Sequence, residues 1–131
     1  VGILGTDDDA IVAGVMEVSI PRDAGRSAYS YHYKFVDDEA VVYRLVSDGA
    51  AVRAGKLALD AWRLLGCRDA GRIDFRLDRD GSPCLVELNP IAGLNAVLSD
   101  LPKLCGLAGI AYPDLIRRIV ESAMRRYRLT P

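Results

Sequence analysis

The spacing of apolar and polar residues predicts strands near the amino end of the chain. Two runs rich in β-branched residues, VGILG (1–5) and IVAGVMEVSI (11–20), are separated by consecutive aspartates and predict a hairpin. AVVYRLV (40–46) predicts another strand. The intervening PRDAGRSAYSYHYKF (21–35) has no regular period, so we interpret it as a long loop.

Helical spacing follows over residues 50–65. The polar positions recur every three or four residues and therefore share one face: Arg53, Lys56, Asp60 and Arg63. The positions predicted to face the core are Val52, Leu59, Trp62 and Leu65. Ser47 or Asp48 is expected to cap the start of this helix, and Gly66 to close it in a left-handed conformation.

Two more helices are expected toward the carboxyl end. Ser99 can cap a short helix that tolerates Pro102 in its first turn. The last helix is predicted to start at Pro113 and to run to about Tyr127. Its predicted apolar face consists of Leu115, Ile116, Ile119, Val120, Ala123 and Met124. Together these elements predict one α+β domain over residues 1–131, an antiparallel β-sheet with flanking helices.

A second hairpin is predicted in RIDFRLDRDGSPCLVELNP (72–90). Asp80-Gly81 favours a two-residue type I′ turn, and centring the turn there fixes which residues lie opposite each other. The pairs on one face are Arg72 with Asn89 and Asp74 with Glu87. The other face, predicted to be the core side, carries Ile73, Phe75 and Leu77 opposite Leu88, Val86 and Cys84. A one-residue bulge would flip the faces of one strand.

The polar face of this hairpin indicates a cation site. Directly opposed carboxylates have Cβ atoms about 5 Å apart and repel each other unless a positive charge lies between them. Asp74 and Glu87 with the amide oxygen of Asn89 form a hard oxygen set, which suits Mg²⁺ or Mn²⁺ completed by water and phosphate oxygens. The alternative is that Arg72 and Arg76 neutralise both acids as surface ion pairs.

Composition narrows the classes of partner. Half of the 131 residues are hydrophobic, enough for one core, and the net charge of -1 provides no basic field for nucleic acid. Small molecules are the expected ligands. Three widely spaced cysteines fit neither a disulfide framework nor zinc knuckles, so we expect a reducing cytoplasm. The sequence shows neither an apolar run of membrane-spanning length nor a secretory signal. Because the chain begins at Val1 inside a strand-like run, we expect that residues precede it in the natural protein.

Several motifs resemble one known family. RIDFRLDRDG, LVELNP and GLNAVLSDLPKL are similar to the carboxy-terminal part of the D-alanine:D-alanine ligases of the ATP-grasp superfamily. VGILG and GVMEV resemble central strands of that family, and AYSYHYKF resembles its mobile loop over the active site. The resemblance therefore covers nearly the whole chain.

The resemblance implies a metal and nucleotide site on the second hairpin. By analogy with the family, Asp74, Glu87 and Asn89 would hold two Mg²⁺ (or Mn²⁺) ions that bridge the phosphates of ATP. The implied reaction is the ATP-dependent joining of two D-alanines through an acyl-phosphate, a step in the synthesis of peptidoglycan precursors.

The resemblance also implies catalytic and substrate-binding roles. Arg72 and the backbone N–H of Gly93 would stabilise negative charge on the acyl-phosphate and the tetrahedral intermediate. Lys34 would close onto the phosphate with its loop and exclude water. Ser99 and the helix that it starts would receive the carboxylate of the second D-alanine.

Two departures from the family pattern bear on these roles. Phe35 follows the loop lysine where many relatives have Tyr, and Leu98 precedes Ser99 in an unusual LNAVL sequence. The chain also contains no Gly-rich phosphate loop, no adenine-side lysines and no amino-terminal domain. We therefore expect it to be the carboxy-terminal portion of an ATP-grasp enzyme, inactive by itself.

Alternative functions and partners remain open from the sequence. One alternative is an ATP-grasp ligase for a different amino acid or a hydroxy acid. Another is a noncatalytic binding module in which the hairpin acids form salt bridges. The expected partners are small molecules (ATP and D-alanine), with no nucleic acid and no membrane, and a homodimer of the full-length enzyme is compatible with the resemblance.

Overall fold

The structure, a computed structural model, describes residues 1–19 and 41–129. The strands are β1 (Gly2–Leu4), β2 (Ile11–Gly14), β3 (Met16–Ser19), β4 (Val42–Leu45), β5 (Ala70–Leu77) and β6 (Pro83–Asn89). The helices are a short 3₁₀ helix, η1 (Asp7–Asp9), and the α-helices α2 (Gly49–Leu64), α3 (Asp100–Leu107) and α4 (Tyr112–Tyr127). The predicted loop over 21–35 lies outside the described residues.

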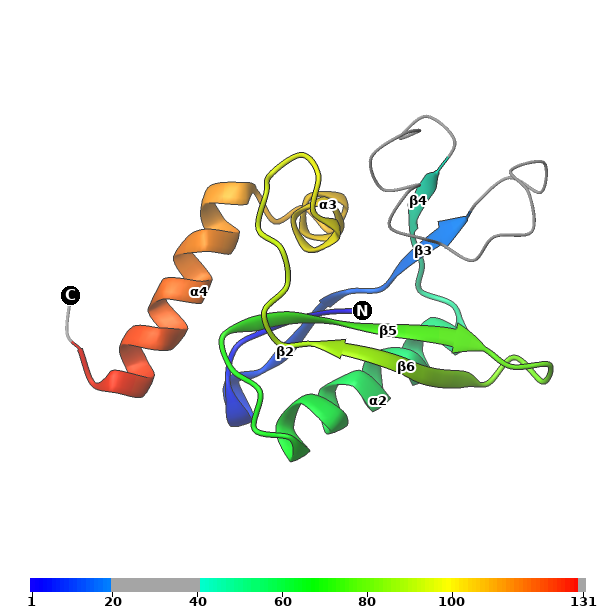
Figure 1. Ribbon diagram of the computed structural model, residues 1–131, viewed down its shortest axis with the longest axis horizontal. Coiled ribbons are helices and arrows are strands. Elements are labelled where there is room, and N and C mark those ends of the chain that lie inside the picture. Colours follow the sequence, from blue (N-terminus) through cyan, green and yellow to red (C-terminus); the bar gives the residue numbers. More distant parts are fainter. Residues whose placement is uncertain (20–40, 130–131) are drawn as a thin grey trace.

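The four-stranded sheet is the middle layer of the molecule (Figure 1). Its strand order is β2-β1-β5-β6, and every neighbouring pair is antiparallel. Helix α2 covers one face, while α3 and α4 lie on the other side (Figure 1). The predicted α+β class with an antiparallel sheet and flanking helices is confirmed.

The strand predicted over 11–20 is divided between two sheets. Its first half, β2, pairs with β1 as the predicted hairpin. Its second half, β3, leaves the main sheet and forms a two-stranded antiparallel ribbon with β4. Hydrophobic periodicity could not reveal this division because the apolar residues continue from β2 into β3 without a turn signal between them.

Apart from Trp62, the residues of α2 that are buried against the sheet are small. Its buried positions follow helical spacing: Ala51, Ala54, Gly55, Ala58 and Trp62. Val52 and Leu65, predicted to face the core, are 66% and 65% exposed, so that part of the prediction is wrong. Ala51, Ala54 and Ala58 line the core side instead, because a helix lined by alanine can approach the strands closely.

Trp62 is the large side chain of this interface, and it is fully buried. Its indole Nε1–H donates to the Gly5 carbonyl oxygen at 3.1 Å, so its polar atom is satisfied inside the core. The ring lies against Gly71 of β5, where an added Cβ would come within 2.4 Å of the Trp62 ring and 2.6 Å of the Asn89 carbonyl oxygen. Gly71 is therefore required by the close approach of the ring.

The second core lies between the sheet and α3 and α4. Its buried members are Leu4, Leu101, Leu104, Cys105 and Leu115. Helix α4 is also fastened to the sheet by polar contacts: Ser122 Oγ lies 3.1 Å from Thr6 Oγ1, and Arg126 forms an ion pair with Asp69. Thr6 Oγ1 accepts a hydrogen bond from the backbone N–H of Asp69 at 3.0 Å. These contacts hold α4 against the start of β5, which begins at the residue after Asp69.

The predicted caps of α2 are confirmed. The Asp48 side chain accepts the backbone N–H of Ala51 at 2.9 Å, which satisfies a donor in the first turn. Gly66 has φ +64° and follows the last turn, where Cys67 N–H donates to the Trp62 carbonyl at 3.0 Å.

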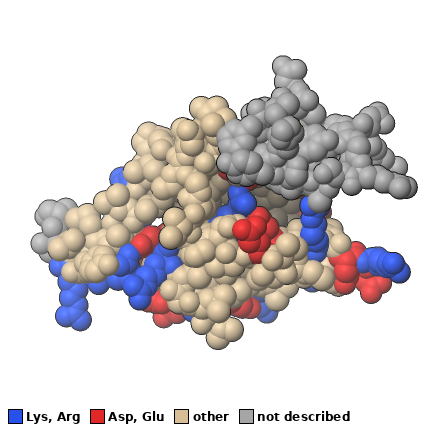
Figure 2. Space-filling view, viewed as in Figure 1, with Lys and Arg blue, Asp and Glu red and all other residues tan. Residues whose placement is uncertain are grey.

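Charged side chains of both signs are mixed over the surface. On the face shown in Figure 2, Lys and Arg gather near the end of α4, with acidic residues among them. Within the described ranges, no helix is long and apolar enough to cross a bilayer. All three cysteines are free; Cys67 and Cys105 are buried, and Cys84 is exposed.

Substituting Gly71→Ala should destabilise the 131-residue chain because the new methyl group would overlap the Trp62 ring. We expect the free energy of unfolding to fall by about 2–3 kcal/mol, the range for overpacking a core. Urea titration followed by the fluorescence of Trp62 measures the change. Gly106→Ala is the matched control, because its Cβ would meet nothing within 4 Å in α3; it should be neutral or stabilising by up to about 1 kcal/mol. Equal effects of the two substitutions would contradict this account.

The thiols should differ in reactivity with pH. Burial raises the pKa of Cys105 from 9.0 to about 11, partly opposed by the charge of Arg118, and burial also raises the pKa of Cys67. Because the thiolate is the reactive form, Cys84 should react first with a disulfide reagent at mildly alkaline pH. The buried thiols favour the folded state below the pKa of the unfolded chain. This contribution is lost as the pH rises toward 11, so the midpoint of urea unfolding should fall over that range. Fast modification of Cys67 and Cys105 as well as Cys84 in the native chain would refute the expected order of thiol reactivity.

Candidate functional site

The central part of the β5–β6 hairpin has the predicted register. Arg72 pairs with Asn89, Ile73 with Leu88, and Asp74 with Glu87. The Ile73 N–H also donates to the Val1 carbonyl oxygen at 2.9 Å, which continues the ladder between β1 and β5. Strand alternation therefore sends Arg72 and Asp74 toward the α3 side, while Ile73 enters the core beneath α2.

The turn that sets this register differs from the prediction. A type I′ turn needs positive φ at Asp80 and Gly81, but only Gly81, with φ +74°, has it. The N–H of Gly81 donates to the carbonyl of Asp78 at 3.1 Å, and Asp78 N–H donates to Ser82 O at 2.9 Å. The connection is therefore a three-residue loop closed by a glycine bulge, one residue longer than predicted.

A bulge further along β6 restores the register. Phe75 pairs with Leu85, so the ladder shifts by one residue after Asp74 and leaves Val86 as the extra residue. The longer turn and this bulge cancel each other at Asp74, which is why the predicted pairing holds there. Beyond the bulge the core-side prediction is wrong. Cys84 pairs with Arg76 and not with Leu77, because the bulge turns this part of β6 over, and Leu77 and Val86 are also exposed.

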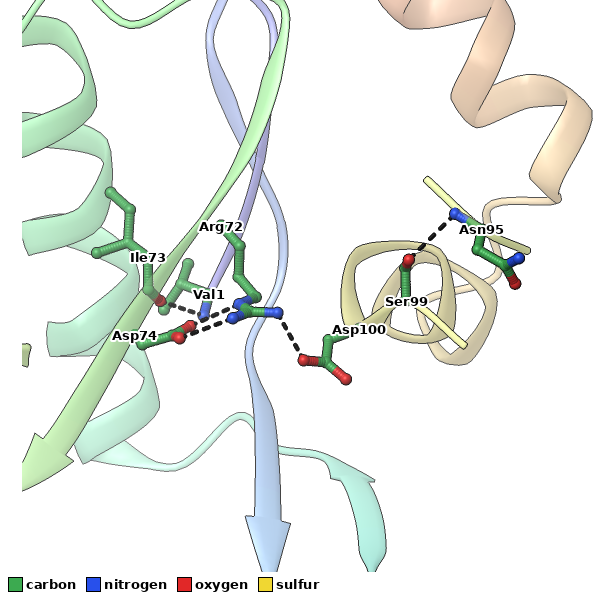
Figure 3. A network of polar contacts seen from close by, with 7 residues as sticks. All are labelled: Val1, Arg72, Ile73, Asp74, Asn95, Ser99 and Asp100. Atoms are coloured by element: carbon green, nitrogen blue, oxygen red, sulfur yellow. Dashed lines mark hydrogen bonds and ion pairs between the residues drawn. The ribbon is translucent and has the colours of Figure 1, made fainter. Parts of the chain in front are cut away.

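Arg72 is held by two carboxylates from different parts of the fold (Figure 3). Its Nε and Nη2 donate to the two oxygens of Asp74 at 2.7 and 2.9 Å, a bidentate pair within β5. Its Nη1 donates to Asp100 Oδ2 at 2.5 Å, and Asp100 lies at the start of α3. The neutralisation of Asp74 by Arg72, which the sequence left open, is therefore present.

Sequence reasoning did not identify Asp100 as a site residue. The residue is 6% exposed, which is unusual for an acid unless it is paired. The signal available in the sequence was an acid in the first helical turn, immediately after Ser99, but this is also a common position for a solvated carboxylate. Only the packing of α3 beside β5 reveals its partner.

The carboxylates also determine the charge state of Arg72. Burial would lower the pKa of Arg72, but the hydrogen bonds and charge of Asp74 raise it, as do the charges of Asp100 and Glu87. The net effect raises the pKa of Arg72 above its ordinary value. The guanidinium of Arg72 therefore stays positively charged at all accessible pH values.

A cleft of ≈ 650 Å³ opens beside this ion-pair network. Arg72, Asp74 and Asp100 line one side, and Glu17 and Arg44 of the β3–β4 ribbon line another. Glu17 and Arg44 form an exposed ion pair at 2.6 Å. Of the predicted site residues, Arg72 and Asp74 belong to the described lining of this cleft.

Asp74, Glu87 and Asn89 fit a magnesium site by their chemistry. They project from one face of the hairpin, and the buried amide nitrogen of Asn89 has no hydrogen-bond partner. Rotating the amide by half a turn would place its oxygen there instead, so this position can offer a ligand to a cation. Within the described parts of the chain, no three His, Cys, Asp or Glu residues are grouped to hold a metal. Two acids and an amide thus depend on water or phosphate oxygens to complete the shell.

Gly93 and Ser99 lie in contact in the loop between β6 and α3. A Cβ at Gly93 would lie 2.6 Å from Ser99 Oγ, so a side chain at Gly93 would displace the hydroxyl. Ser99 occupies the cap position of α3, but its Oγ accepts the Asn95 N–H at 3.1 Å (Figure 3) and does not bond the helix. Lys34 lies outside the described residues.

Comparison with known proteins identifies the family. A model of the D-ala D-ala ligase C-terminus matches residues 1–121. The chain belongs to the D-alanine–D-alanine ligase family. It is 45% identical over 128 residues to the D-alanine–D-alanine ligase of Pelotomaculum thermopropionicum, covering 93% of this chain and 40% of that protein. It is 33% identical over 130 residues to the ligase of Limosilactobacillus fermentum, covering 97% and 33%.

A solved ligase structure shares the fold. The Bacillus anthracis D-alanine–D-alanine ligase complexed with ATP matches with a TM-score of 0.67 at 22% identity, over 97% of this chain and 38% of that one. This ligase-family chain thus spans about a third to two fifths of the length of its relatives. All the predicted site residues lie within the part matched by the family model.

The contact between Gly93 and Ser99 can be tested by a double-mutant cycle. Gly93→Ala should lower the free energy of unfolding, because the methyl group overlaps Ser99 Oγ. Ser99→Ala should relieve part of that loss, because the nearest remaining atom, its Cβ, lies 3.4 Å away in ordinary contact. We expect a coupling energy of about 1–2 kcal/mol from urea titrations of the four proteins. Additive effects would show that the two residues are not in contact.

Proposed function

We propose that the chain is the carboxy-terminal portion of the catalytic domain of an ATP-dependent D-alanine–D-alanine ligase. The observation that carries this proposal is the polar face of the β5–β6 hairpin, where Asp74 is paired with Glu87 and Arg72 with Asn89. The family match supports the proposal, because these residues lie in the part of the chain that matches the D-ala D-ala ligase C-terminus. In the proposed reaction, the carboxylate of one D-alanine takes the γ-phosphoryl group of ATP, and the amine of a second D-alanine displaces phosphate.

Arg72 and Gly93 are proposed to act on the reacting oxygens. Transfer of the phosphoryl group places negative charge on the phosphoryl oxygens. Attack of the amine on the acyl-phosphate then places negative charge on the carbonyl oxygen, which becomes the oxyanion of the tetrahedral intermediate. The guanidinium of Arg72, whose position is fixed, can stabilise that charge without reorganising. The N–H of Gly93 would serve the same oxygen, since glycine allows the backbone to approach a ligand closely.

Asp74, Glu87 and Asn89 are proposed to hold two Mg²⁺ or Mn²⁺ ions with ATP. The support comes from the fit of their oxygens and of the unpartnered amide group to a hard cation. When bound, Mg²⁺ would neutralise charge on the ATP phosphates. Asp74 keeps lone pairs on both oxygens while Arg72 binds it, so it can serve the arginine and a cation together.

Ser99 and Lys34 are proposed to complete the substrate site. Ser99 stands at the start of α3, where backbone N–H groups favour a carboxylate such as that of the second D-alanine. Lys34 would approach the phosphate from its loop. A cytoplasmic location belongs to the same proposal. The homodimer of the full-length enzyme stays a prediction.

One observation favours the noncatalytic alternative. Arg72 already forms ion pairs with Asp74 and Asp100, as a purely structural network would. Under that alternative, the hairpin acids need no metal and the domain binds a partner chain. A further alternative is an ATP-grasp ligase that uses a different amino acid or a hydroxy acid in place of the second D-alanine.

The two functions differ in metal-nucleotide binding. We expect the 131-residue chain to release no ADP in a D-alanine-dependent way, while a protein spanning the full length of the relatives does. In that longer protein, Asp74→Asn should weaken calorimetric binding of Mg²⁺ with a nonhydrolysable ATP analogue by roughly 10-fold or more. Asp114→Asn is the control, because Asp114 is an exposed acid of α4 paired with Arg117 at 3.0 Å.

Of three informative results, the first would contradict only the expected inactivity of the short chain, and the other two would contradict the proposal. D-alanine-dependent ADP release from the short chain would show that half of the nucleotide site suffices. Unchanged binding in Asp74→Asn would remove the hairpin from the metal site. Absence of metal-nucleotide binding from the longer protein would favour the noncatalytic module.

A further inference from the structure

Asp100 contacts Arg72 from outside the hairpin. Its carboxylate is buried, and Oδ2 lies 2.5 Å from Nη1 of Arg72. A buried acid is costly unless an opposite charge and hydrogen bonds compensate for its lost hydration. The start of α3 contributes part of that compensation, because the helix dipole favours a negative charge in its first turn.

Asp74 and Asp100 fix different parts of one guanidinium. Asp74 binds the edge formed by Nε and Nη2, and Asp100 binds Nη1. If Asp74 alone bound Arg72, the guanidinium could still move together with the Asp74 carboxylate. A second anchor on another element removes this freedom. The three donations leave one N–H on Nη1 and one on Nη2 for another acceptor.

Asp100 also connects the two halves of the proposed site. It follows Ser99 directly in the chain, and Ser99 Oγ lies against Gly93. The ion pair between Arg72 and Asp100 therefore joins β5 to the loop and helix start where the second substrate is proposed to bind (Figure 3).

We propose that Asp100 is a positioning residue for the ligase reaction. It holds Arg72 so that the remaining N–H groups meet the oxygen that becomes negative when the amine attacks. This inference rests on the proposed ligase function. It adds a residue that acts through Arg72 and does not itself touch substrate.

Nuclear magnetic resonance of the arginine side chains tests the anchor directly in the 131-residue chain. In the unmodified chain, rotation about the Cζ–Nη bonds of Arg72 should be slow, giving separate Nη–H signals at low temperature. Asp100→Asn keeps the shape but loses the charge, so these signals should average, while the Nε–H signal stays because Asp74 still binds it. Asp114→Asn should change neither signal of Arg72. Unchanged Nη–H signals in Asp100→Asn would overturn the anchor.

Kinetics of the longer protein test the positioning role. Asp100→Asn should lower kcat by roughly 10- to 100-fold, the effect of misplacing a catalytic group, and leave the KM for ATP unchanged. Asp100→Glu should recover part of kcat by restoring the charge. Asp100→Asn also breaks a largely buried ion pair, so its thermal midpoint should fall below that of Asp114→Asn. The kcat of every variant is therefore measured well below its thermal midpoint, where a loss of stability alone would leave kcat unchanged.

The outcomes separate this inference from the ligase proposal. If unmodified protein makes the dipeptide and Asp100→Asn keeps full kcat, Asp100 has no positioning role and the ligase proposal stands. If the unmodified longer protein releases no ADP with D-alanine, the ligase proposal fails and the catalytic role of Asp100 fails with it. The resonance experiment then still decides whether Asp100 anchors Arg72.

Discussion

The alternation of side chains along β5 is the constraint on which the rest of the structure depends. Ile73 enters the core under α2, so its neighbours Arg72 and Asp74 must point to the opposite face of the sheet, toward α3. Because β5 lies between β1 and β6, hydrogen bonds on both sides hold that orientation. The burial that stabilises the domain thus also directs its charged residues to one face.

Asp100 reaches the polar face of β5 only because the second core holds α3 alongside that strand. Leu101 and Leu104 bury the apolar side of α3, and this fixes the position of Asp100 at its start. Arg72 then meets acids from two elements: Asp74, two residues along its own strand, and Asp100 across the interface with α3. Arg72 thus gains a fixed position from hydrophobic packing that it does not itself take part in.

The hairpin shows how a correct register can rest on an incorrect turn. Asp-Gly suggested a two-residue loop, but Gly81 instead closes a three-residue loop, and Val86 supplies the compensating bulge. Local sequence favours both turns similarly, since each needs a glycine with positive φ. The bulge depends on how β6 follows the twist of β5, which no short motif encodes. The pairing of Asp74 with Glu87 was predictable, whereas the exposed outer half of the hairpin was not.

The sequence by itself determined the α+β class, the helices, the caps of α2, and the shared face of Arg72, Asp74, Glu87 and Asn89. It could do so because periodicity, capping and strand alternation are local properties of the chain. Only the tertiary structure decided that alanines rather than Val52 and Leu65 line the core, that β2 and β3 belong to different sheets, and that Asp100 meets Arg72. These features depend on how closely two elements approach each other, and that distance is set by packing between residues far apart in the chain.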